Sequence, residues 1–171
     1  MLILMAGLPG TGKSTLSRAL AGDLGGTVLD KDVVRAALFP AGDIEYSTEQ
    51  DDFCMAIMLK VAGWMLRKNP ERYVFLDGRT FSRAYQLKRA KGYAEAISQR
   101  WKIIECTCSE ESAMRRLNSG EPHPAANRNP ELYHEVKSRF EEITLPKVCV
   151  NTDNPLAECL QSAKAYLLVE P

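Results

Sequence analysis

The chain has 171 residues, of which 45% are apolar and 26% are charged. This is close to the average for soluble globular proteins and excludes a disordered or fibrous chain, and the length predicts a single domain over residues 1–171. The 22 basic and 22 acidic residues cancel, so the overall charge gives no attraction for nucleic acid or an anionic membrane, and such binding would need a local patch.

Short, continuous apolar runs alternate with helical periods along the chain. The first run, residues 2–5, is too short to span a membrane and predicts a buried strand, not a signal peptide. The strands expected from such runs are 2–5, 27–29, 73–76, 102–106 and 147–150. The expected helices are 13–23, 32–38, 48–67, 82–99, 110–117, 130–143 and 156–168. This alternation predicts an α/β fold with a parallel sheet, whose ligands bind outside the carboxyl ends of the strands.

Two further groups of side chains are expected in the core. One is a stripe with four-residue spacing on helix 48–67, typical of a buried helical face: Phe53, Ile57, Val61 and Met65. The other is the set of five cysteines, which are odd in number and lack zinc-ribbon spacing. We expect buried free thiols, with Cys106 and Cys108 on one side of a strand. Free thiols suit a reducing compartment, and we expect a cytoplasmic protein.

The strongest motif follows the first expected strand. Residues 7–15 read G-L-P-G-T-G-K-S-T and match the phosphate-binding pattern G-x-x-x-x-G-K-[ST]. Glycines let backbone N–H groups approach phosphate oxygens, and the helix that begins near Lys13 points its positive end at the same anion. Lys13 is expected to contact the β- and γ-phosphates and Ser14 to bind Mg²⁺; the alternative is a glycine-rich turn with an exposed lysine. The predicted nucleotide-binding residues are Gly7, Leu8, Pro9, Gly10, Thr11, Gly12, Lys13, Ser14 and Thr15.

Two carboxylates and an arginine follow the second expected strand, namely Asp30, Asp32 and Arg35. Parallel strands end at one edge of a sheet, so this segment should lie beside the phosphate-binding loop. Asp32 is suited to accept the proton of an acceptor hydroxyl, and Arg35 to grip a polar or anionic part of the acceptor, with Asp30 beside them. The alternative is that Asp30 or Asp32 caps the next helix, and one carboxylate can cap while the other acts.

A third motif ends the third expected strand, in the sequence Leu76-Asp77-Gly78. Asp77 is expected to hold Mg²⁺ together with Ser14, unless it is only a cap or turn residue. Motor ATPases usually carry Glu after this Asp, and GTPases usually carry an Asn-Lys-x-Asp clamp; the sequence has neither. The motif therefore favours phosphoryl transfer to a hydroxyl over hydrolysis.

Together the three motifs resemble the small P-loop kinases related to polynucleotide kinase, a group that includes adenylylsulfate kinase, chloramphenicol phosphotransferase and the zeta toxins. The resemblance implies a P-loop NTPase three-layer sandwich with a five-stranded parallel sheet, as in nucleoside monophosphate kinases, and a small lid. It also implies ATP and Mg²⁺ as cofactors, Asp32 as the general base and Arg35 as an acceptor contact.

The lid is expected at about residues 118–129, a stretch rich in turn formers. Such kinases place arginines before and within the lid, which implies Arg116 and Arg128 as catalytic residues that stabilise the transferred phosphoryl group; the alternative is two solvated helix-face residues. The chain departs from the group by having Asn118-Ser119-Gly120 where a second arginine often stands. In this group the loop after the last strand passes the adenine, which implies a nucleotide contact from Asp153.

The acceptor is the least determined part of the prediction. Residues 79–102 hold seven basic residues and one acidic residue and could follow a polynucleotide backbone, whereas the acidic segment 43–52 would repel nucleic acid. The alternative for each of these two charged segments is a solvent-exposed surface with no binding role. Arg79 and Arg83 are the better candidates for acceptor binding, because they follow Asp77 at the end of a strand.

The sequence thus predicts an ATP-dependent kinase that phosphorylates a hydroxyl of a small molecule, with no membrane partner. The alternatives are a polynucleotide 5′-hydroxyl kinase and a zeta-toxin-like kinase of a nucleotide sugar. A non-enzymatic nucleotide switch is disfavoured by Asp32 and Arg35.

Overall fold

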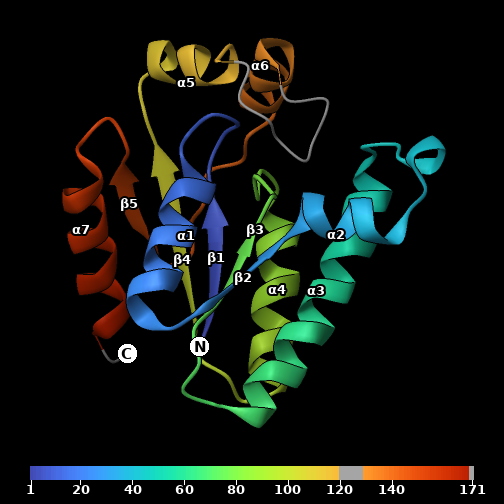
Figure 1. Cartoon of the computed structure of the whole chain (residues 1–171), viewed down its shortest axis with the longest axis vertical. Coiled ribbons are helices and arrows are strands. Elements are labelled where there is room, and N and C mark those ends of the chain that lie inside the picture. The colour runs from blue at the N-terminus through green and yellow to red at the C-terminus, as the bar shows by residue number, and fades with distance from the viewer. Residues whose placement is uncertain (120–128, 170–171) are drawn as a thin grey trace.

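The computed structural model describes residues 1–119 and 129–169. Its centre is a five-stranded, all-parallel sheet in the order β2-β3-β1-β4-β5 (Figure 1). The strands are β1 (Leu2–Ala6), β2 (Thr27–Asp30), β3 (Val74–Asp77), β4 (Trp101–Thr107) and β5 (Val148–Asn151). The parallel α/β sheet expected from the apolar runs is confirmed, with each strand at its expected place in the chain.

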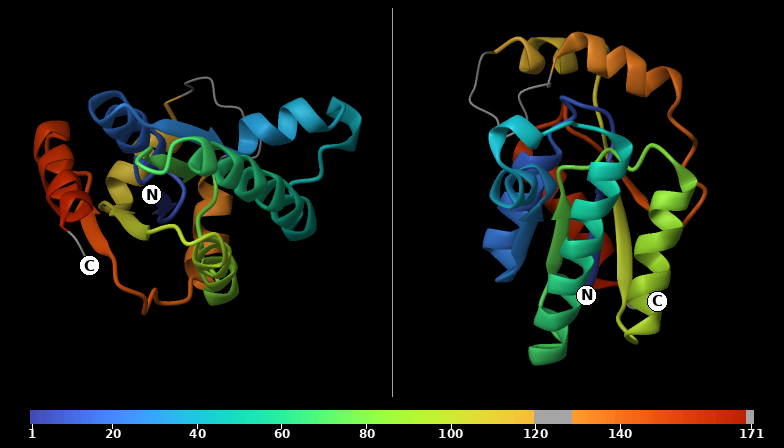
Figure 2. Two further views of the ribbon diagram at one scale, coloured as in Figure 1. Left: turned by 90° about the horizontal axis from the view of Figure 1, so that it is seen from below. Right: turned by 90° about the vertical axis from the view of Figure 1, so that its right-hand side faces the viewer.

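Helices on both faces of the sheet complete a three-layer sandwich. The helices within the described ranges are α1 (Lys13–Leu24), α2 (Lys31–Leu38), the 3-10 turn η1 (Ala41–Asp43), α3 (Thr48–Lys68), α4 (Ala84–Ala96), α5 (Glu110–Leu117), α6 (Pro130–Ser138) and α7 (Leu156–Leu168). One face of the sheet packs against α1 and α7 through side chains such as Leu20 and Ala163. The other packs against α3 and α4 through Met58 and Leu87. Figure 2 shows α3 and α7 on opposite sides of the molecule.

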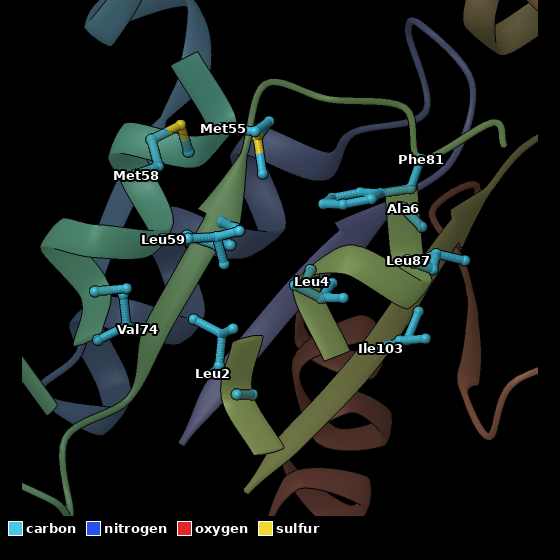
Figure 3. Close-up of a cluster of buried hydrophobic side chains, with 14 of the residues drawn as sticks. Leu2, Leu4, Ala6, Met55, Met58, Leu59, Val74, Phe81, Leu87 and Ile103 are labelled. Atoms are coloured by element: carbon cyan, nitrogen blue, oxygen red, sulfur yellow. The ribbon is translucent and has the colours of Figure 1, made fainter. Parts of the chain in front are cut away.

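The central strand β1 belongs to both cores. Leu2, Leu4 and Ala6 pack with the α3 and α4 side chains (Figure 3), whereas Ile3 and Met5 pack on the α1 and α7 side. All five residues are buried, which explains why the sequence shows a continuous apolar run and not an alternating one. This buried strand holds the start of the phosphate-binding loop in a fixed place.

The face of α3 that packs on the core is not the predicted one. The prediction for the Phe53 stripe was wrong, since the side chains of Phe53 and Val61 are 53% and 42% exposed. The buried face consists of Cys54, Met55, Met58, Leu59, Ala62 and Leu66. Because apolar residues occur on nearly every side of α3, the periodicity fitted two faces, and only packing against the sheet selects one.

Two expected helices are shorter than predicted. Helix α4 begins at Ala84 and ends at Ala96, and α6 ends at Ser138 instead of residue 143. After α6 the chain is irregular, and Phe140, Ile143 and Leu145 pack on the α3 and α4 core. These apolar residues predicted a longer helix, because an irregular segment that packs on the core is as rich in apolar residues as a helix that does so.

The expectation of five buried thiols was wrong for two cysteines. Cys54, Cys106 and Cys159 are buried, but Cys108 is half-buried and Cys149 is exposed. Cys108 lies beyond the end of β4 at Thr107, so it shares no strand face with Cys106. Cys149 lies on the edge strand β5, whose neighbouring Val148 and Val150 pack into the α1 and α7 core. In the described part of the chain, no helix has the length and apolar character to cross a membrane.

Candidate active site

The three predicted motifs meet at one cavity at the carboxyl edge of the sheet. The cavity has a volume of about 860 Å³, and α5 and α6 lie above the strand ends at this edge (Figure 1). Its lining includes the phosphate-binding loop, the start of α2, the end of β3 and residues of α5 and the β5 loop. The predicted site residues on its wall are Pro9, Gly10, Gly12, Lys13, Ser14, Thr15, Asp32, Arg35, Asp77, Arg79, Arg83 and Arg116.

The phosphate-binding loop requires its glycines. Gly7, Gly10 and Gly12 have φ angles of 131°, 78° and 76°, in the region that disfavours side chains. A Cβ on Gly7 would lie 2.2 Å from the Cys106 carbonyl oxygen, and one on Gly10 would lie 2.9 Å from a backbone oxygen of α5. Lys13 Nζ donates to the carbonyl oxygens of Gly7 at 2.9 Å and Leu8 at 2.7 Å. The ammonium charge thus lies within the loop at the start of α1, which fits a phosphate-binding cradle.

The oxygen ligands expected for Mg²⁺ lie beside this loop. Asp77 is fully buried, and its Oδ2 accepts a hydrogen bond from Ser17 Oγ at 2.9 Å. Both Ser14 and Asp77 line the cavity. A hydroxyl and a carboxylate fit Mg²⁺, which binds one or two protein oxygens together with nucleotide phosphates and water. Ser17, which orients the carboxylate, was missed because it lies outside the motif.

Asp30 caps α2, which is the alternative role left open by the sequence. Its Oδ1 accepts from the backbone N–H of Asp32 at 2.9 Å. Burial and the neighbouring Asp77 raise the pKa of Asp30 above its usual value. A contact between Asp30 and the acceptor stays a prediction.

Asp32 and Arg35 belong to a network of four charges between the start of α2 and the start of α3, of which Lys31, Asp32 and Arg35 are buried and Asp51 is half-buried. Asp32 is 6% exposed and Arg35 is 2% exposed. Asp32 Oδ1 lies 2.8 Å from Arg35 Nη1 and 3.2 Å from Lys31 Nζ. Asp51 Oδ1, on the first turn of α3, lies 2.8 Å from Lys31 Nζ and also pairs with Arg35 Nη2. The guanidinium of Arg35 lies 4.9 Å from the centre of the Tyr46 ring, so it is fixed on several sides.

Sequence reasoning missed Lys31 and Asp51 as members of this network. From the sequence, Asp51 is expected in an acidic, solvent-exposed segment, because no motif or spacing in the sequence connects it with Arg35. Burial lowers the pKa of Lys31 to about 8, although the nearby carboxylate of Asp32 opposes this effect.

The two arginines after β3 lie on the same wall but differ in burial. Arg79 is 4% exposed, and its Nη1 lies 2.6 Å from Asp52 Oδ1 on α3. The side chain of Arg83 is 41% exposed and pairs with Glu141 at 3.2 Å. Consecutive residues at the start of α3, Asp51 and Asp52, therefore hold one buried arginine each. Binding of the acceptor by Arg79 and Arg83 stays a prediction.

Arg116 joins the phosphate-binding loop to the loop after β5. It donates to the Gly10 carbonyl oxygen at 3.2 Å and to Thr152 Oγ1 at 2.9 Å and Thr152 O at 2.7 Å. Asp153 accepts from the backbone N–H of Ser109 at 2.7 Å, and this hydrogen bond lowers the pKa of Asp153. The nucleotide contacts expected of Arg116 and Asp153 stay predictions.

Most of the predicted lid lies outside the residues that the structure describes. Arg128 and residues 120–127 lie outside the described residues, and only 118, 119 and 129 of the expected lid lie within them.

The fold and the site define a P-loop protein. Structures with this fold include the APS kinase CysC of Mycobacterium tuberculosis in complex with AMPPNP and APS, with a TM-score of 0.74 and 17% identity over 98% of this chain and 97% of that one. Kti12 of Chaetomium thermophilum in complex with ADP-AlF3 has a TM-score of 0.74 and 17% identity over the full length of both chains. A gluconokinase of Sinorhizobium meliloti has a TM-score of 0.70 and 19% identity over 96% of this chain and 90% of that one.

The chain belongs to the AAA_33 family, described as an AAA domain, which matches residues 2–143. No curated protein matches the sequence. The family and the fold confirm the resemblance to small P-loop kinases and the three-layer sandwich with its five-stranded parallel sheet.

Proposed function

We propose that the protein transfers the γ-phosphoryl group of ATP to a hydroxyl group of a small molecule. The observation that carries the proposal is the shared cavity, in which the buried carboxylate of Asp32 and the loop residues Lys13 and Ser14 line one space. A P-loop alone supports nucleotide binding, whereas a fixed carboxylate opposite it suits an acceptor hydroxyl.

Each group of residues in the cavity has its own role in the proposed reaction. The loop amides and Lys13 would hold the phosphates, and Ser14 and Asp77 would hold Mg²⁺, which supplies charge neutralisation when it is bound. Asp32 Oδ1 already has two cationic partners, so we assign Oδ2 to the acceptor hydroxyl. The acceptor oxygen bonds to the γ-phosphorus, the bond to the β–γ bridging oxygen breaks, and ADP leaves. Asp32 takes the acceptor proton and returns it to water.

Transfer is favoured over hydrolysis because Gly78 follows Asp77, where a hydrolytic ATPase would carry a glutamate. Gly78 has a φ of 80°, and a Cβ there would lie 2.7 Å from Asp30 Oδ1. The backbone itself therefore disfavours any side chain at this position.

The experiment is a screen of hydroxyl metabolites and 5′-hydroxyl oligonucleotides for conversion of ATP to ADP with a phosphorylated product. In Asp32→Asn the shape is kept and the base is lost, so kcat should fall by roughly 10²–10⁴-fold while ATP affinity is kept. Asp43→Asn, an exposed carboxylate in the 3-10 turn, is the matched control and should behave as wild type. A change in KM alone would reassign Asp32 to acceptor binding.

A further inference from the structure

Two arginines of α5 that line the nucleotide side of the cavity have neutral hydrogen-bond partners. Arg116 donates to the Gly10 carbonyl and to Thr152, and Arg115 donates to Ser112 Oγ at 3.2 Å. Neither forms an ion pair with a described carboxylate within 4 Å, so both keep their charge for phosphate groups.

The cations on the acceptor side are arranged differently, since each contacts a carboxylate. Lys31 and Arg35 both pair with Asp32 and Asp51, so two cations and two anions cancel in the network. Three further cations along this wall follow the same pattern: Arg79 with Asp52, Arg83 with Glu141, and Arg139 with Glu135.

Paired charges are poor anion sites. An anionic acceptor would lose its water and would also meet the carboxylates that already hold the arginines, so the desolvation cost would have little compensation. A neutral hydroxyl compound can instead donate to the carboxylates and accept from the arginines without separating any pair. Hydroxyl and amide groups complete this wall, from Tyr46, Thr48, Ser82, Tyr85 and Gln86.

We propose that the acceptor is an uncharged polyhydroxy compound and not one that carries a phosphate, sulfate or carboxylate. This rests on the proposed phosphotransferase function and names the substrate class of that site.

The test compares related acceptors of which one carries an anionic group and the other does not: glucose with gluconate, ribose with ribose 5-phosphate, and adenosine with its 3′-monophosphate. The uncharged member should be phosphorylated with a kcat/KM at least about tenfold higher, equal to about 1.4 kcal/mol. A preference for the anionic members would overturn the neutral-acceptor inference and leave the phosphotransferase function intact. ATP binding without phosphorylation of either class would instead overturn the proposed function, and the inference with it.

A second measurement needs no turnover. With the phosphate-binding loop filled by AMPPNP, low millimolar sodium sulfate should raise the Tm of the wild type no more than sodium chloride of equal ionic strength, because the general stabilising effect of excluded sulfate is small at this concentration. Asp51→Asn frees charge on Lys31 and Arg35 and should make sulfate stabilising, whereas Glu49→Gln, an exposed residue of the same helical turn, should not. Specific stabilisation of the loaded wild type by sulfate would overturn the inference.

An independent observation concerns the outer face of α3, the long helix to the right of α4 in Figure 1. Phe53, Val61 and Trp64 on this face are 53%, 42% and 58% exposed, and Ile57 beside them is half-buried. They form one stripe along the helix, because residues three and four apart share a helical face. An exposed apolar stripe rimmed by charged residues is typical of an interaction surface.

The charges along this stripe indicate what covers it. Glu49 lies at its amino end and Lys68 at its carboxyl end. In an antiparallel pair of α3 helices centred between Met58 and Leu59, Phe53 lies opposite Trp64 of the second copy. The same register places Glu49 opposite Lys68 of the second copy, so aromatic and charged pairs form at both ends by symmetry.

We infer that α3 is the interface of a two-fold homodimer. Lys60 lies near the symmetry axis, where its methylene stem extends the apolar stripe and its ammonium reaches water at the edge. The interface lies on the outside of the helix whose first turn holds Arg35 and Arg79, so the cavity itself stays open.

Sedimentation across a wide range of protein concentration tests the dimer. The wild type should associate, Trp64→Glu should be monomeric, and Leu156→Glu, at a 45% exposed position on α7, should associate as the wild type does. Glu49→Lys should weaken association, and adding Lys68→Glu should restore it, since the pair is reversed in both copies. A wild type that stays monomeric at its highest soluble concentration, or a Trp64→Glu variant that still dimerises, would overturn the inference.

Discussion

Removing the carboxylate of Asp52 should destabilise the fold more than breaking a surface ion pair. Arg79 is 4% exposed, and its Nε has no hydrogen-bond partner among the described residues. In Asp52→Ala its remaining hydrogen-bond partner among the described side chains would be the Tyr85 hydroxyl at 3.5 Å. Breaking a buried pair by removing one partner costs roughly 3–5 kcal/mol. Because the Asp52 side chain is 27% exposed, solvent screening should reduce this to about 2–3 kcal/mol, or roughly 4–12 °C in Tm for a chain of this size.

Urea unfolding and calorimetry of four proteins would measure this effect: the wild type, Asp52→Ala, Arg79→Met and the double variant. The double variant should recover at least half of the loss, because methionine removes the charge that is left unpaired. Glu95→Ala is the control, since it removes the exposed partner of the Lys91–Glu95 pair at 3.1 Å and should change stability by less than about 0.5 kcal/mol. The reasoning fails if Asp52→Ala loses no more than this control, or if the double variant recovers nothing.

Four further predictions follow from the site and the core. Lys13→Ala should abolish phosphoryl transfer while circular dichroism shows an unchanged fold; turnover at the wild-type rate would contradict the P-loop assignment. Gly10→Ala should cost roughly 1–3 kcal/mol in urea unfolding and weaken nucleotide binding, because a side chain is strained at a φ of 78°. Burial lowers the pKa of Lys31 from 10.5 to about 8 in the folded protein, so between these pH values the unfolded chain binds more protons. Stability relative to Lys31→Gln should therefore rise with pH in this window, by at most about 1.4 kcal/mol per pH unit, and a flat difference would contradict the shifted pKa. In thiol labelling, the exposed Cys149 should react first, whereas Cys106, whose pKa burial raises to about 12, should react only after unfolding.

The sequence alone determined the parts of the site that lie close together in the chain. The phosphate-binding loop is readable because its backbone angles demand glycine at fixed spacing, and Lys13 and Ser14 follow within the same nine residues. Asp30 and Asp32 could be placed at the cavity edge because parallel strands end on one side of a sheet. The continuous apolar runs gave all five strands, since a strand covered on both faces leaves no polar positions.

Tertiary structure decided what depends on contacts between distant segments. Only folding brings Asp51 to Arg35 and Asp52 to Arg79, because the spacing between these residues follows no helix or strand period. An acidic segment that the sequence places in solvent therefore supplies the ion-pair partners of two buried arginines. The same is true of α3, where apolar residues on nearly every side left two possible core faces. Packing against β1 and β3 buried the face that includes Met58 and left Phe53 and Trp64 in solvent. Helical periodicity is a property of one element, whereas burial is a property of the element and its neighbours together.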